Sequence, residues 1–318
     1  MRAIVVGAGS WGTAFAKLLL ERDHNVALAA RDLDHARTIS ATQRNPKYLR
    51  EVDLTGVWAT TTDDVPYEEA DVVVLAVPSK AFGTVARSIP GDAPVLSLTK
   101  GLDPDTGERL STLVRDRPVA VLSGPNMAEE VAAGLPTAAV IASDDVELAE
   151  RLQDEINSLT FRVYVNPDLV GVELCAAAKN VIALSAGGVD GLGLGDNAKA
   201  ALITRGLSEM ARLGEACGAE PETFSGLAGM GDLIVTCWHP SGRNRRAGEL
   251  IARGRTPDEA VVEIGQTVEG LTTAPVLRDL SYRLGIELPI TEGVCTVLDG
   301  MPLSELLASL MGRRPTEE

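Results

Sequence analysis

Residues Gly7–Gly12 read GAGSWG, follow directly on a short apolar run, Ala3–Val6, and precede an apolar stretch of helical period. Glycines at this spacing permit a tight turn, a close approach of the backbone to a pyrophosphate, and close packing of a helix on a strand. The N-terminus of the following helix supplies free N–H donors and positive potential. In this strand–turn–helix context the motif predicts dinucleotide binding at Gly7, Gly9 and Gly12, rather than a plain glycine-rich turn.

The rest of the first half alternates short apolar runs with stretches of helical period, a pattern typical of parallel βαβ units. Val72–Val77 is apolar at every position, which indicates a strand covered on both faces. Further expected strands are Val26–Ala29, Val95–Leu98, Val119–Leu122, Ala138–Ile141 and Phe161–Val165, and expected helices are Thr13–Arg22 and Val146–Asn157. We therefore expect an α/β domain of Rossmann type with a mostly parallel sheet.

The pattern changes at Asn166-Pro167, because proline is well placed at a helix start and nearly every later segment has helical period. Expected helices are Asp168–Ser185, Asn197–Cys217, Gly248–Ala252, Pro257–Ile264, Thr273–Leu284 and Leu303–Leu310. With 318 residues the chain is long enough for two cores. We expect a nucleotide-binding domain, residues 1–166, followed by an all-α domain, residues 167–318, whose last residues, Arg313–Glu318, fray.

The bulk composition excludes several classes of partner. A net charge of −16 argues against a nucleic-acid or anionic-membrane surface, because both need a broad positive field. No apolar run approaches the roughly 18 residues of a membrane span, and no signal-peptide pattern opens the chain. The four cysteines match neither a zinc spacing nor a disulfide framework, and three histidines suggest no metal cluster. We expect a cytoplasmic protein without a metal.

Lys179 lies in a segment, Val170–Leu184, whose other residues are almost all apolar. A helix that is apolar all round is buried, and an ammonium buried without a partner is costly. The chain uses lysine only six times against twenty-three arginines. We interpret Lys179 as a catalytic group; the alternative is a lysine near a helix end whose stem covers apolar surface.

Two further segments carry candidate partners for this lysine. Lys100 ends the run Val95–Lys100, at the carboxyl edge of the sheet where ligands bind in open α/β folds. Asp232 and Thr236 are four residues apart and share one face if this piece is helical. Asp232 is then either the partner that keeps Lys179 charged or the N-cap of a helix, and both roles are compatible.

Basic residues indicate two anion sites. Arg31 ends the second expected strand, where NAD-specific domains carry an acidic residue for the ribose 2′-hydroxyl. An arginine pairs instead with a 2′-phosphate, and a charge-assisted bond of about 1.5–3 kcal/mol gives roughly 10 to 100-fold preference. NADP(H) is therefore favoured, while Asp32 next door leaves NAD(H) possible. The dense basic stretch Ser241–Arg246 is interpreted as binding an anionic substrate.

Motifs spread over nearly the whole chain together resemble the NAD(P)-dependent glycerol-3-phosphate dehydrogenases of bacterial type. They are Gly7–Gly12, Leu98–Gly101, Ser123–Asn126, Cys175–Asn180, Gly226–Leu233, Arg243–Arg245 and Val268–Gly270. The resemblance implies a Rossmann domain followed by a helical domain like the C-terminal one of 6-phosphogluconate dehydrogenase. It also implies a homodimer that reduces dihydroxyacetone phosphate to sn-glycerol 3-phosphate for phospholipid synthesis.

The same resemblance assigns site residues. The dinucleotide would be held by the glycine motif and by Ser10, Trp11, Arg31, Lys100, Ala128, Arg243, Thr267 and Glu269. The substrate would be held by Lys100, Gly124, Asn126, Lys179, Asp232, Gly242, Arg243 and Asn244. Asn126 and Gly242 stand where the bacterial pattern usually has serine, as in the eukaryotic cytosolic relatives, so they concern a side-chain contact more than the reaction.

The resulting hypothesis is a hydride transfer from the nicotinamide C4 to the ketone carbon, with Lys179 as proton donor. The catalytic group also includes Asp232, Asn180 and Thr236. Asp232 and Asn180 would orient the ammonium, and Lys100 would add positive potential. Arg243 and the backbone near Asn244 would hold the substrate phosphate. Two alternatives stay open: a 3-hydroxyacid dehydrogenase or ketopantoate-type reductase, whose substrates carry carboxylates, and a non-catalytic NADPH sensor.

Overall fold

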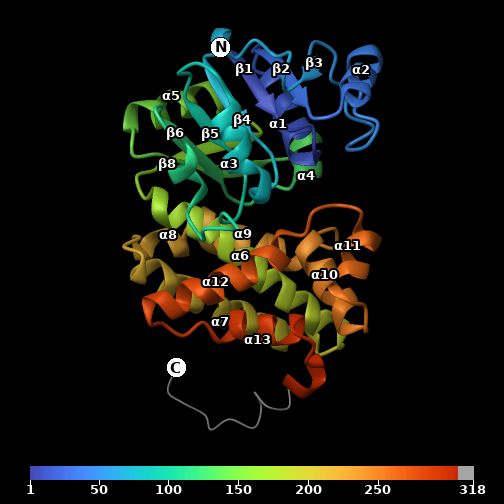
Figure 1. The fold of residues 1–318 in the computed structure, drawn as a ribbon, viewed down its shortest axis with the longest axis vertical. Helices are drawn as coiled ribbons and strands as arrows, with labels where there is room; N and C mark the ends of the chain where they lie inside the picture. The colour runs from blue at the N-terminus through green and yellow to red at the C-terminus, as the bar shows by residue number, and fades with distance from the viewer. Residues whose placement is uncertain (307–318) are drawn as a thin grey trace.

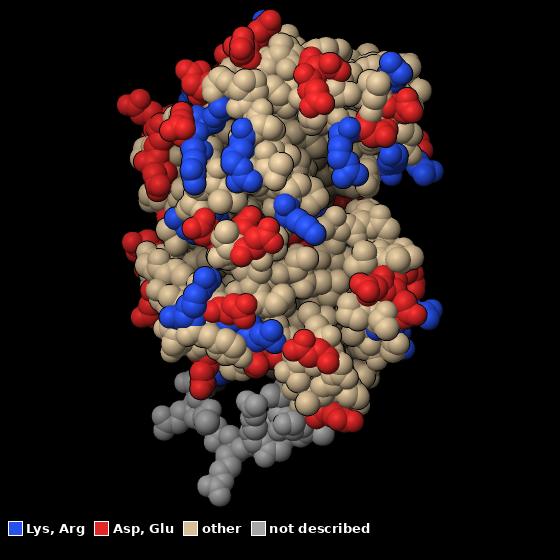
Figure 2. All heavy atoms as spheres, in the orientation of Figure 1, with Lys and Arg blue, Asp and Glu red and all other residues tan. Residues whose placement is uncertain are grey.

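The computed structural model describes residues 1–306 and has two lobes stacked along its long axis, an N-terminal lobe with a sheet and a C-terminal lobe of helices (Figure 1). The last strand ends at Asn166 and the long helix that opens the second lobe begins at Leu169. We propose the domain boundary at Asn166-Pro167 on that basis. Acidic and basic side chains are interspersed over the face of both lobes that Figure 2 shows.

The N-terminal lobe is built on one eight-stranded sheet in the order β3-β2-β1-β4-β5-β6-β7-β8. The strands are β1 (Arg2–Val6), β2 (Asn25–Ala30), β3 (Trp58–Thr61), β4 (Val72–Leu75), β5 (Val95–Ser97), β6 (Val119–Ser123), β7 (Thr137–Ala142) and β8 (Phe161–Asn166). Every neighbouring pair is parallel except β6 and β7, which are antiparallel. The strand order reverses between β1 and β4, which is where dinucleotide folds bind their ligand.

Helices cover both faces of the sheet because its strands are apolar on both sides. They are α1 (Ser10–Leu20), α2 (Leu33–Thr42), α3 (Ser79–Ser88), α4 (Ala128–Ala132) and α5 (Val146–Ile156), with short 3₁₀ turns η1 (Tyr67–Glu69) and η2 (Leu110–Leu113). In β1, Val5 belongs to the core that contains Phe15 of α1, whereas Ile4 belongs to the core that contains Phe82 of α3. The period of two along β1 thus assigns one helix layer to each face.

The C-terminal lobe is all-helical and is organised around α6 (Figure 1). Its elements are α6 (Leu169–Gly191), α7 (Gly195–Ala216), α8 (Pro221–Ser225), the π-helical turn η3 (Leu227–Gly231), α9 (Asp232–Trp238), α10 (Arg243–Ala252), α11 (Pro257–Ile264), α12 (Glu269–Leu284) and α13 (Pro289–Leu298). Helices α6 and α10 meet backbone to backbone: a Cβ built on Gly248 would lie 1.8 Å from the carbonyl oxygen of Leu184. This close crossing brings the start of α10 next to the helix that carries Lys179.

One expectation from the sequence is wrong for α6, namely that no apolar run approaches the length of a membrane span. The helix has 23 residues and an 18-residue window of mean hydropathy 1.5, enough in length and composition to cross a membrane. However, 89% of that window is buried inside the protein. Because other helices and the strands β6 and β7 pack against it, its apolar character is that of a core helix.

Several element boundaries also differ from expectation. The strand expected at Val72–Val77 ends at Leu75, because the chain turns toward Pro78, which precedes α3. Helix α6 continues about two turns beyond Ser185, and α10 begins five residues before Gly248. Of the helix expected at Leu303–Leu310, residues 303–306 are helical; its remainder and the tail Arg313–Glu318 lie outside the described residues.

Candidate active site

The glycine motif forms the turn between β1 and α1, and its three glycines differ in the space around them. Gly7 has φ +116°, and a Cβ there would lie 2.3 Å from the carbonyl oxygen of Ala76. A Cβ on Gly12 would lie 1.9 Å from the carbonyl oxygen of Gly7, so helix and turn touch through their backbones. A Cβ on Gly9 would meet nothing within 4 Å. The loop therefore needs Gly7 and Gly12 for its own shape, whereas Gly9 leaves open space beside the helix start.

The start of α1 is suited to an anion. Its N-cap is Gly9, and no side chain caps the helix, so the first N–H groups from Ser10 onward are not satisfied by a capping group. Trp11 packs edge-on against Phe15 with ring centroids 5.7 Å apart, and its buried Nε1 has no hydrogen-bond partner among the described residues. Unpaired donors at a helix N-terminus are what a pyrophosphate binds.

Asn45 supports this loop and was not foreseen from the sequence. Its side chain is completely buried and donates to the carbonyl oxygen of Ala8 at 3.0 Å and to Oγ1 of Thr13 at 2.8 Å. Its Oδ1 accepts from Nε2 of His35 at 2.9 Å and from the backbone N–H groups of residues 47 and 48. The only sequence signal was the Asn45-Pro46 pair, which is typical of a turn.

Arg31 and Asp32 follow β2, on the side of the sheet where the strands end. Arg31 is exposed and is thus available to a ligand. The carboxylate of Asp32 accepts a hydrogen bond from the backbone N–H of His35 at 2.7 Å and caps α2. The acidic neighbour is therefore already engaged by its own helix.

Lys179 is buried on α6, with 3% of its surface exposed, and its ammonium has two side-chain partners from α9. Nζ is 2.5 Å from Oδ1 of Asp232 and 2.9 Å from Oγ1 of Thr236. Asp232 and Thr236 share one face of α9, and α9 has no side-chain cap. The N-cap interpretation of Asp232 is therefore wrong, because its carboxylate is turned into the protein toward the lysine.

Lys100 reaches the same carboxylate from the other lobe. Its Nζ donates to Oδ2 of Asp232 at 2.9 Å, to Oδ1 of Asn126 at 2.9 Å and to the carbonyl oxygen of Gly124 at 3.3 Å. Gly124 has φ +127°, a conformation that favours glycine and turns this carbonyl toward the ammonium. One carboxylate thus joins two ammonium groups from the two lobes.

The charges of this cluster perturb one another. Burial lowers the pKa of Lys179 to about 7; the carboxylate of Asp232 opposes that effect and Lys100 adds to it. Burial disfavours the ionised form of Asp232, but the charges of Lys100 and Lys179 outweigh burial and lower its pKa. Because two ammonium groups face one carboxylate, the carboxylate stays ionised and the buried amine is the group that releases a proton near neutrality.

The contacts of Asn180 differ from the role expected for it in the catalytic group. Its Nδ2 donates to the carbonyl oxygen of Ala176 at 3.2 Å, and its Oδ1 accepts from Nδ2 of Asn244 at 2.8 Å. Oδ1 of Asn244 in turn accepts from the backbone N–H of Gly270 at 2.9 Å. Asn180 therefore links α6 to α10 and α12 and does not orient the ammonium of Lys179, which Asp232 and Thr236 hold instead.

The remaining predicted substrate residues lie at the start of α10 and beside Lys100. Arg243 is exposed at the start of α10 and donates to the carbonyl oxygen of Thr267 at 3.0 Å. The N-cap of α10 is Gly242, which has no side chain, so the first N–H groups of this helix have no capping side chain. Nδ2 of Asn126 is buried without a partner among the described residues. Asn126 therefore carries an unpaired donor on the same side chain that contacts Lys100 through Oδ1.

Glu269, at the start of α12, connects the two lobes on the side of the cofactor motif. Its Oε2 accepts from Oγ of Ser79 at 2.6 Å and its Oε1 from the backbone N–H of Ser79 at 3.2 Å, at the first residue of α3. Burial raises the pKa of Glu269. Ala128 opens α4, which packs against α1. These positions place both residues beside the sheet edge that carries the glycine motif.

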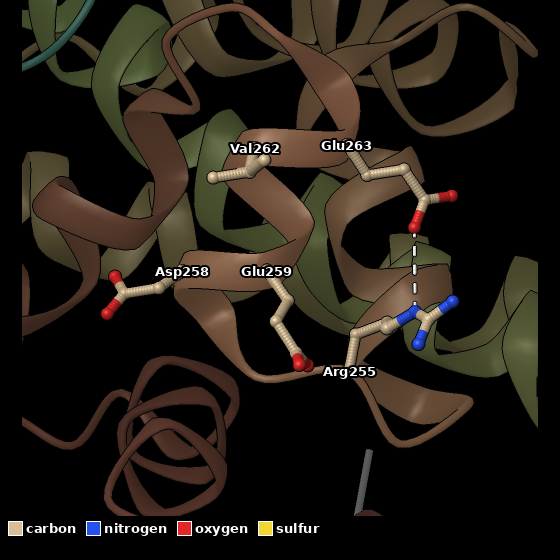
Figure 3. A pocket seen from close by; sticks show the side chains of 5 residues that line it. All are labelled: Arg255, Asp258, Glu259, Val262 and Glu263. Carbon is tan, nitrogen blue, oxygen red and sulfur yellow. Dashed lines mark ion pairs between the residues drawn. The ribbon is translucent and has the colours of Figure 1, made fainter.

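A separate surface hollow of about 390 Å³ lies on α11 (Figure 3). Its lining residues are Arg255, Asp258, Glu259, Val262 and Glu263, and Arg255 is paired with Glu263 at 3.5 Å. Three carboxylates against one paired arginine do not suit an anionic ligand, and none of these residues contacts the lysine cluster. Among residues 1–306, no group of three or more His, Cys, Asp or Glu side chains is arranged to hold a metal ion.

Comparison with known proteins gives a consistent result over both lobes. Residues 2–149 match the family described as the N-terminus of NAD-dependent glycerol-3-phosphate dehydrogenase, and residues 168–308 match the family described as its C-terminus. The chain is 48% identical to glycerol-3-phosphate dehydrogenase [NAD(P)+] of Moorella thermoacetica, over 99% of this chain and 96% of that protein. It is 45% identical to the enzyme of the same name from Geobacillus thermodenitrificans, over 99% and 95% of the two chains.

Solved structures agree with the sequence relatives. The crystal structure of glycerol-3-phosphate dehydrogenase from Coxiella burnetii superposes with a TM-score of 0.92 at 37% identity, covering 98% of this chain and 99% of that one. A ketopantoate reductase from Ralstonia eutropha superposes with a TM-score of 0.61 at 19% identity, covering 96% of this chain and 100% of that one. The second likeness shows a shared fold alone.

Proposed function

This chain belongs to the NAD-dependent glycerol-3-phosphate dehydrogenase family, and on that premise we propose how its own residues carry out the reaction. The activity is that of glycerol-3-phosphate dehydrogenase [NAD(P)+], the reduction of dihydroxyacetone phosphate to sn-glycerol 3-phosphate that serves phospholipid metabolism. What the family alone does not give is the role of each side chain. The observation that carries our proposal is the carboxylate of Asp232 between the ammonium groups of Lys179 and Lys100.

The glycine motif fits a dinucleotide. The open space at Gly9 and the uncapped start of α1 suit a pyrophosphate, and the unpaired Nε1 of Trp11 provides a further donor. When bound, the nicotinamide cofactor supplies a hydride to the ketone carbon of the substrate. We assign its binding to the motif together with Ser10, Trp11 and Ala128, and to Glu269 from the helical lobe.

Lys179 is assigned as the proton donor. As the hydride arrives, negative charge develops on the substrate oxygen, and a nearby ammonium stabilises this charge and delivers its proton. The pKa of about 7 suits this task, because a group that titrates near the working pH both carries and releases its proton. Asp232 and Thr236 hold the ammonium in place, and Lys100 contributes a second positive charge.

The substrate phosphate is assigned to the start of α10. Arg243 is exposed there, and the uncapped N–H groups of the helix give an anion site independent of side chains. The side chain of Asn244 is engaged by Asn180 and Gly270, so its contribution comes from its backbone. The free Nδ2 of Asn126 and the neighbouring Lys100 are assigned to the oxygens of the three-carbon unit.

NADP(H) is the favoured cofactor in this proposal, and NAD(H) is the alternative. Arg31 is free to pair with a 2′-phosphate, whereas the carboxylate of Asp32, which would suit a 2′-hydroxyl, caps α2. We also propose a homodimer and a cytoplasmic location, both of which rest on the family.

The function is tested by following the oxidation of NADPH or NADH in the presence of dihydroxyacetone phosphate or of ketopantoate. We expect turnover with dihydroxyacetone phosphate and none with the keto acid, because the anion site at α10 is placed for a phosphate. Turnover with the keto acid alone would favour the reductase alternative, and binding of NADPH without any turnover would favour the sensor.

A further inference from the structure

Glu173 is a second buried charge on α6, six residues before Lys179 and therefore about 9 Å away along the helix axis. Only 4% of its surface is exposed. Oε1 accepts from the backbone N–H of Ser111 at 2.8 Å, and Oε2 accepts from Oγ of Ser111 at 2.6 Å and from Nη1 of Arg109 at 2.9 Å. Both partners belong to the N-terminal lobe, so Glu173 fastens the catalytic helix to the sheet domain.

The segment that Glu173 holds is the one that begins with Lys100. After Gly101 the chain leaves the sheet, and Leu102 forms a β-bridge with Arg109, which closes residues 102–109 into a loop. Leu102 is buried in the core of the helical lobe. The base of the loop is therefore held on two sides, by the bridge from Leu102 and by the carboxylate of Glu173.

These contacts complete a ring around the reacting groups. Lys179 and Glu173 share α6, Glu173 holds Arg109, Arg109 pairs with Leu102, and Lys100 lies two residues before Leu102. The ring closes where both lysines meet Asp232. The contact at Glu173 thus gives the two lysines a second connection, through the loop, besides the carboxylate that they share.

We propose that Glu173 is a positioning residue, which sets the separation of the Lys100 and Lys179 ammonium groups by holding Arg109 and Ser111 against α6. The proposal rests on the catalytic roles assigned above to these two lysines. It explains why the buried part of α6 carries a second charge, at a position where burial disfavours one. Glu173 itself contacts neither lysine and acts through the loop.

A purely structural role is the alternative, and the chain offers a matched control. Glu209 on α7 is equally buried, with 4% of its surface exposed. It accepts hydrogen bonds from the backbone N–H groups of Ile290 and Thr291 and from Oγ1 of Thr291. Its partners lie at the start of α13, within the helical lobe. Glu209 therefore matches the burial and the backbone and hydroxyl contacts of Glu173, without its arginine and without a link to the loop of Lys100.

The measured quantity is the pH dependence of kcat, which reports the protonation of Lys179. The charged or titratable groups that act on Lys179 are Asp232 and Lys100, with the thiols of Cys175 and Cys237 nearby. Burial raises the pKa of both thiols, so they stay neutral at working pH. The ammonium of Lys100 lowers the pKa of Lys179. A larger separation of the two lysines must therefore raise it.

The experiment compares the full-length variants Glu173→Gln, Ser111→Ala and Glu209→Gln in the reduction of dihydroxyacetone phosphate. We expect Glu173→Gln to lower kcat at least about tenfold, because a misplacement of about 1 Å can lower the rate roughly 10²-fold. The alkaline limb of its kcat profile should move to higher pH, with the KM for NADPH unchanged. Ser111→Ala should move the limb less and in the same direction, and Glu209→Gln should leave it in place.

An unchanged limb and kcat in Glu173→Gln, or an equal shift in Glu209→Gln, would overturn the proposal. If Glu173→Gln does not fold, Ser111→Ala decides alone: a shift supports the proposal and its absence overturns it. Lys179→Met in the same assay separates the role of Glu173 from the catalytic assignment of Lys179. Its inactivity beside an unaffected Glu173→Gln removes only the role of Glu173, whereas wild-type turnover of Lys179→Met removes the catalytic assignment itself.

Discussion

Oδ1 of Asp232 lies 2.5 Å from Nζ of Lys179, in a buried ion pair that joins α9 to α6. The other oxygen, Oδ2, pairs with Lys100 at 2.9 Å. This carboxylate therefore contacts both ammonium groups and opposes the lowering of the Lys179 pKa by burial. It also connects the lobe that carries the cofactor motif with the lobe that carries the lysine.

Replacement of Asp232 by asparagine removes the charge that opposes the lowering of the Lys179 pKa. We expect the alkaline limb of kcat for reduction to move to lower pH, and turnover near pH 8 to fall. The folded protein should also lose about 3–5 kcal/mol, because removal of one partner leaves buried charges uncompensated. A pH profile of kcat and urea unfolding measure the two effects.

Asp168→Asn is the matched control for this change. Asp168 is also buried, but its carboxylate caps α6 and accepts from Gly171, Glu220 and Thr223. It should lower stability and leave the pH profile unmoved. Identical profiles for Asp232→Asn and the wild type would contradict the electrostatic role assigned to Asp232.

The wild-type protein should show opposite pH dependences in its two directions. Reduction needs the ammonium of Lys179, so kcat should fall as pH rises through about 7, the pKa that burial gives this group. Oxidation of glycerol 3-phosphate needs the free amine, so kcat should rise through the same pH. Initial rates in both directions with saturating substrates measure the limbs, and limbs that run in the same direction would argue against Lys179 as the group that titrates.

Two glycines of the cofactor motif should respond differently to alanine. A Cβ at Gly12 would lie 1.9 Å from the carbonyl oxygen of Gly7, so Gly12→Ala should distort the turn and lower the melting temperature. Gly9→Ala meets nothing within 4 Å and should fold as the wild type, yet its methyl group fills the space assigned to the pyrophosphate. We expect an unchanged melting temperature and a raised KM for NADPH; an unchanged KM would place the cofactor elsewhere.

Arg31 should determine the preference for NADPH. Loss of one charge-assisted pair with a 2′-phosphate costs about 1.5–3 kcal/mol, so Arg31→Ala should lower kcat/KM for NADPH by roughly 10 to 100-fold. The value for NADH should change little, since NADH has no 2′-phosphate. Asp34→Ala, at an exposed position of α2 nearby, serves as the control. Equal losses with both cofactors would mean that Arg31 stacks on the adenine instead.

Much of the fold follows from local patterns in the sequence. The continuous apolar runs predicted the buried parallel strands, because only strands covered on both faces have that composition. Strand β3 was not predicted: it lies at the sheet edge and reads Trp58-Ala-Thr-Thr61, of which only Ala59 is buried. Helix α10 was predicted too short because its first turn, beginning at Arg243, is polar and carries no helical apolar stripe. Such elements depend on neighbours that local periodicity does not contain.

Some residues of the candidate site were likewise predictable from the sequence and others were not. Lys179 was recognisable because its apolar surroundings made a charge improbable without a partner. Asp232 and Asn180 were both expected to orient the ammonium, and only the packing of the helices shows that Asp232 contacts it while Asn180 donates to its own helix. Glu173 and Asn45 were missed because their contacts reach 62 and 37 residues along the chain.

The most direct test of the account is the turnover of Lys179→Met, which keeps the shape of the side chain and removes the proton donor. We expect kcat for the reduction of dihydroxyacetone phosphate to fall by roughly 10² to 10⁴-fold, with the binding of NADPH retained. Lys199→Met, at another buried lysine that pairs with Asp190 on α6, should keep kcat within about threefold of the wild type. Near wild-type turnover in Lys179→Met, with cofactor and substrate bound, would contradict the central claim.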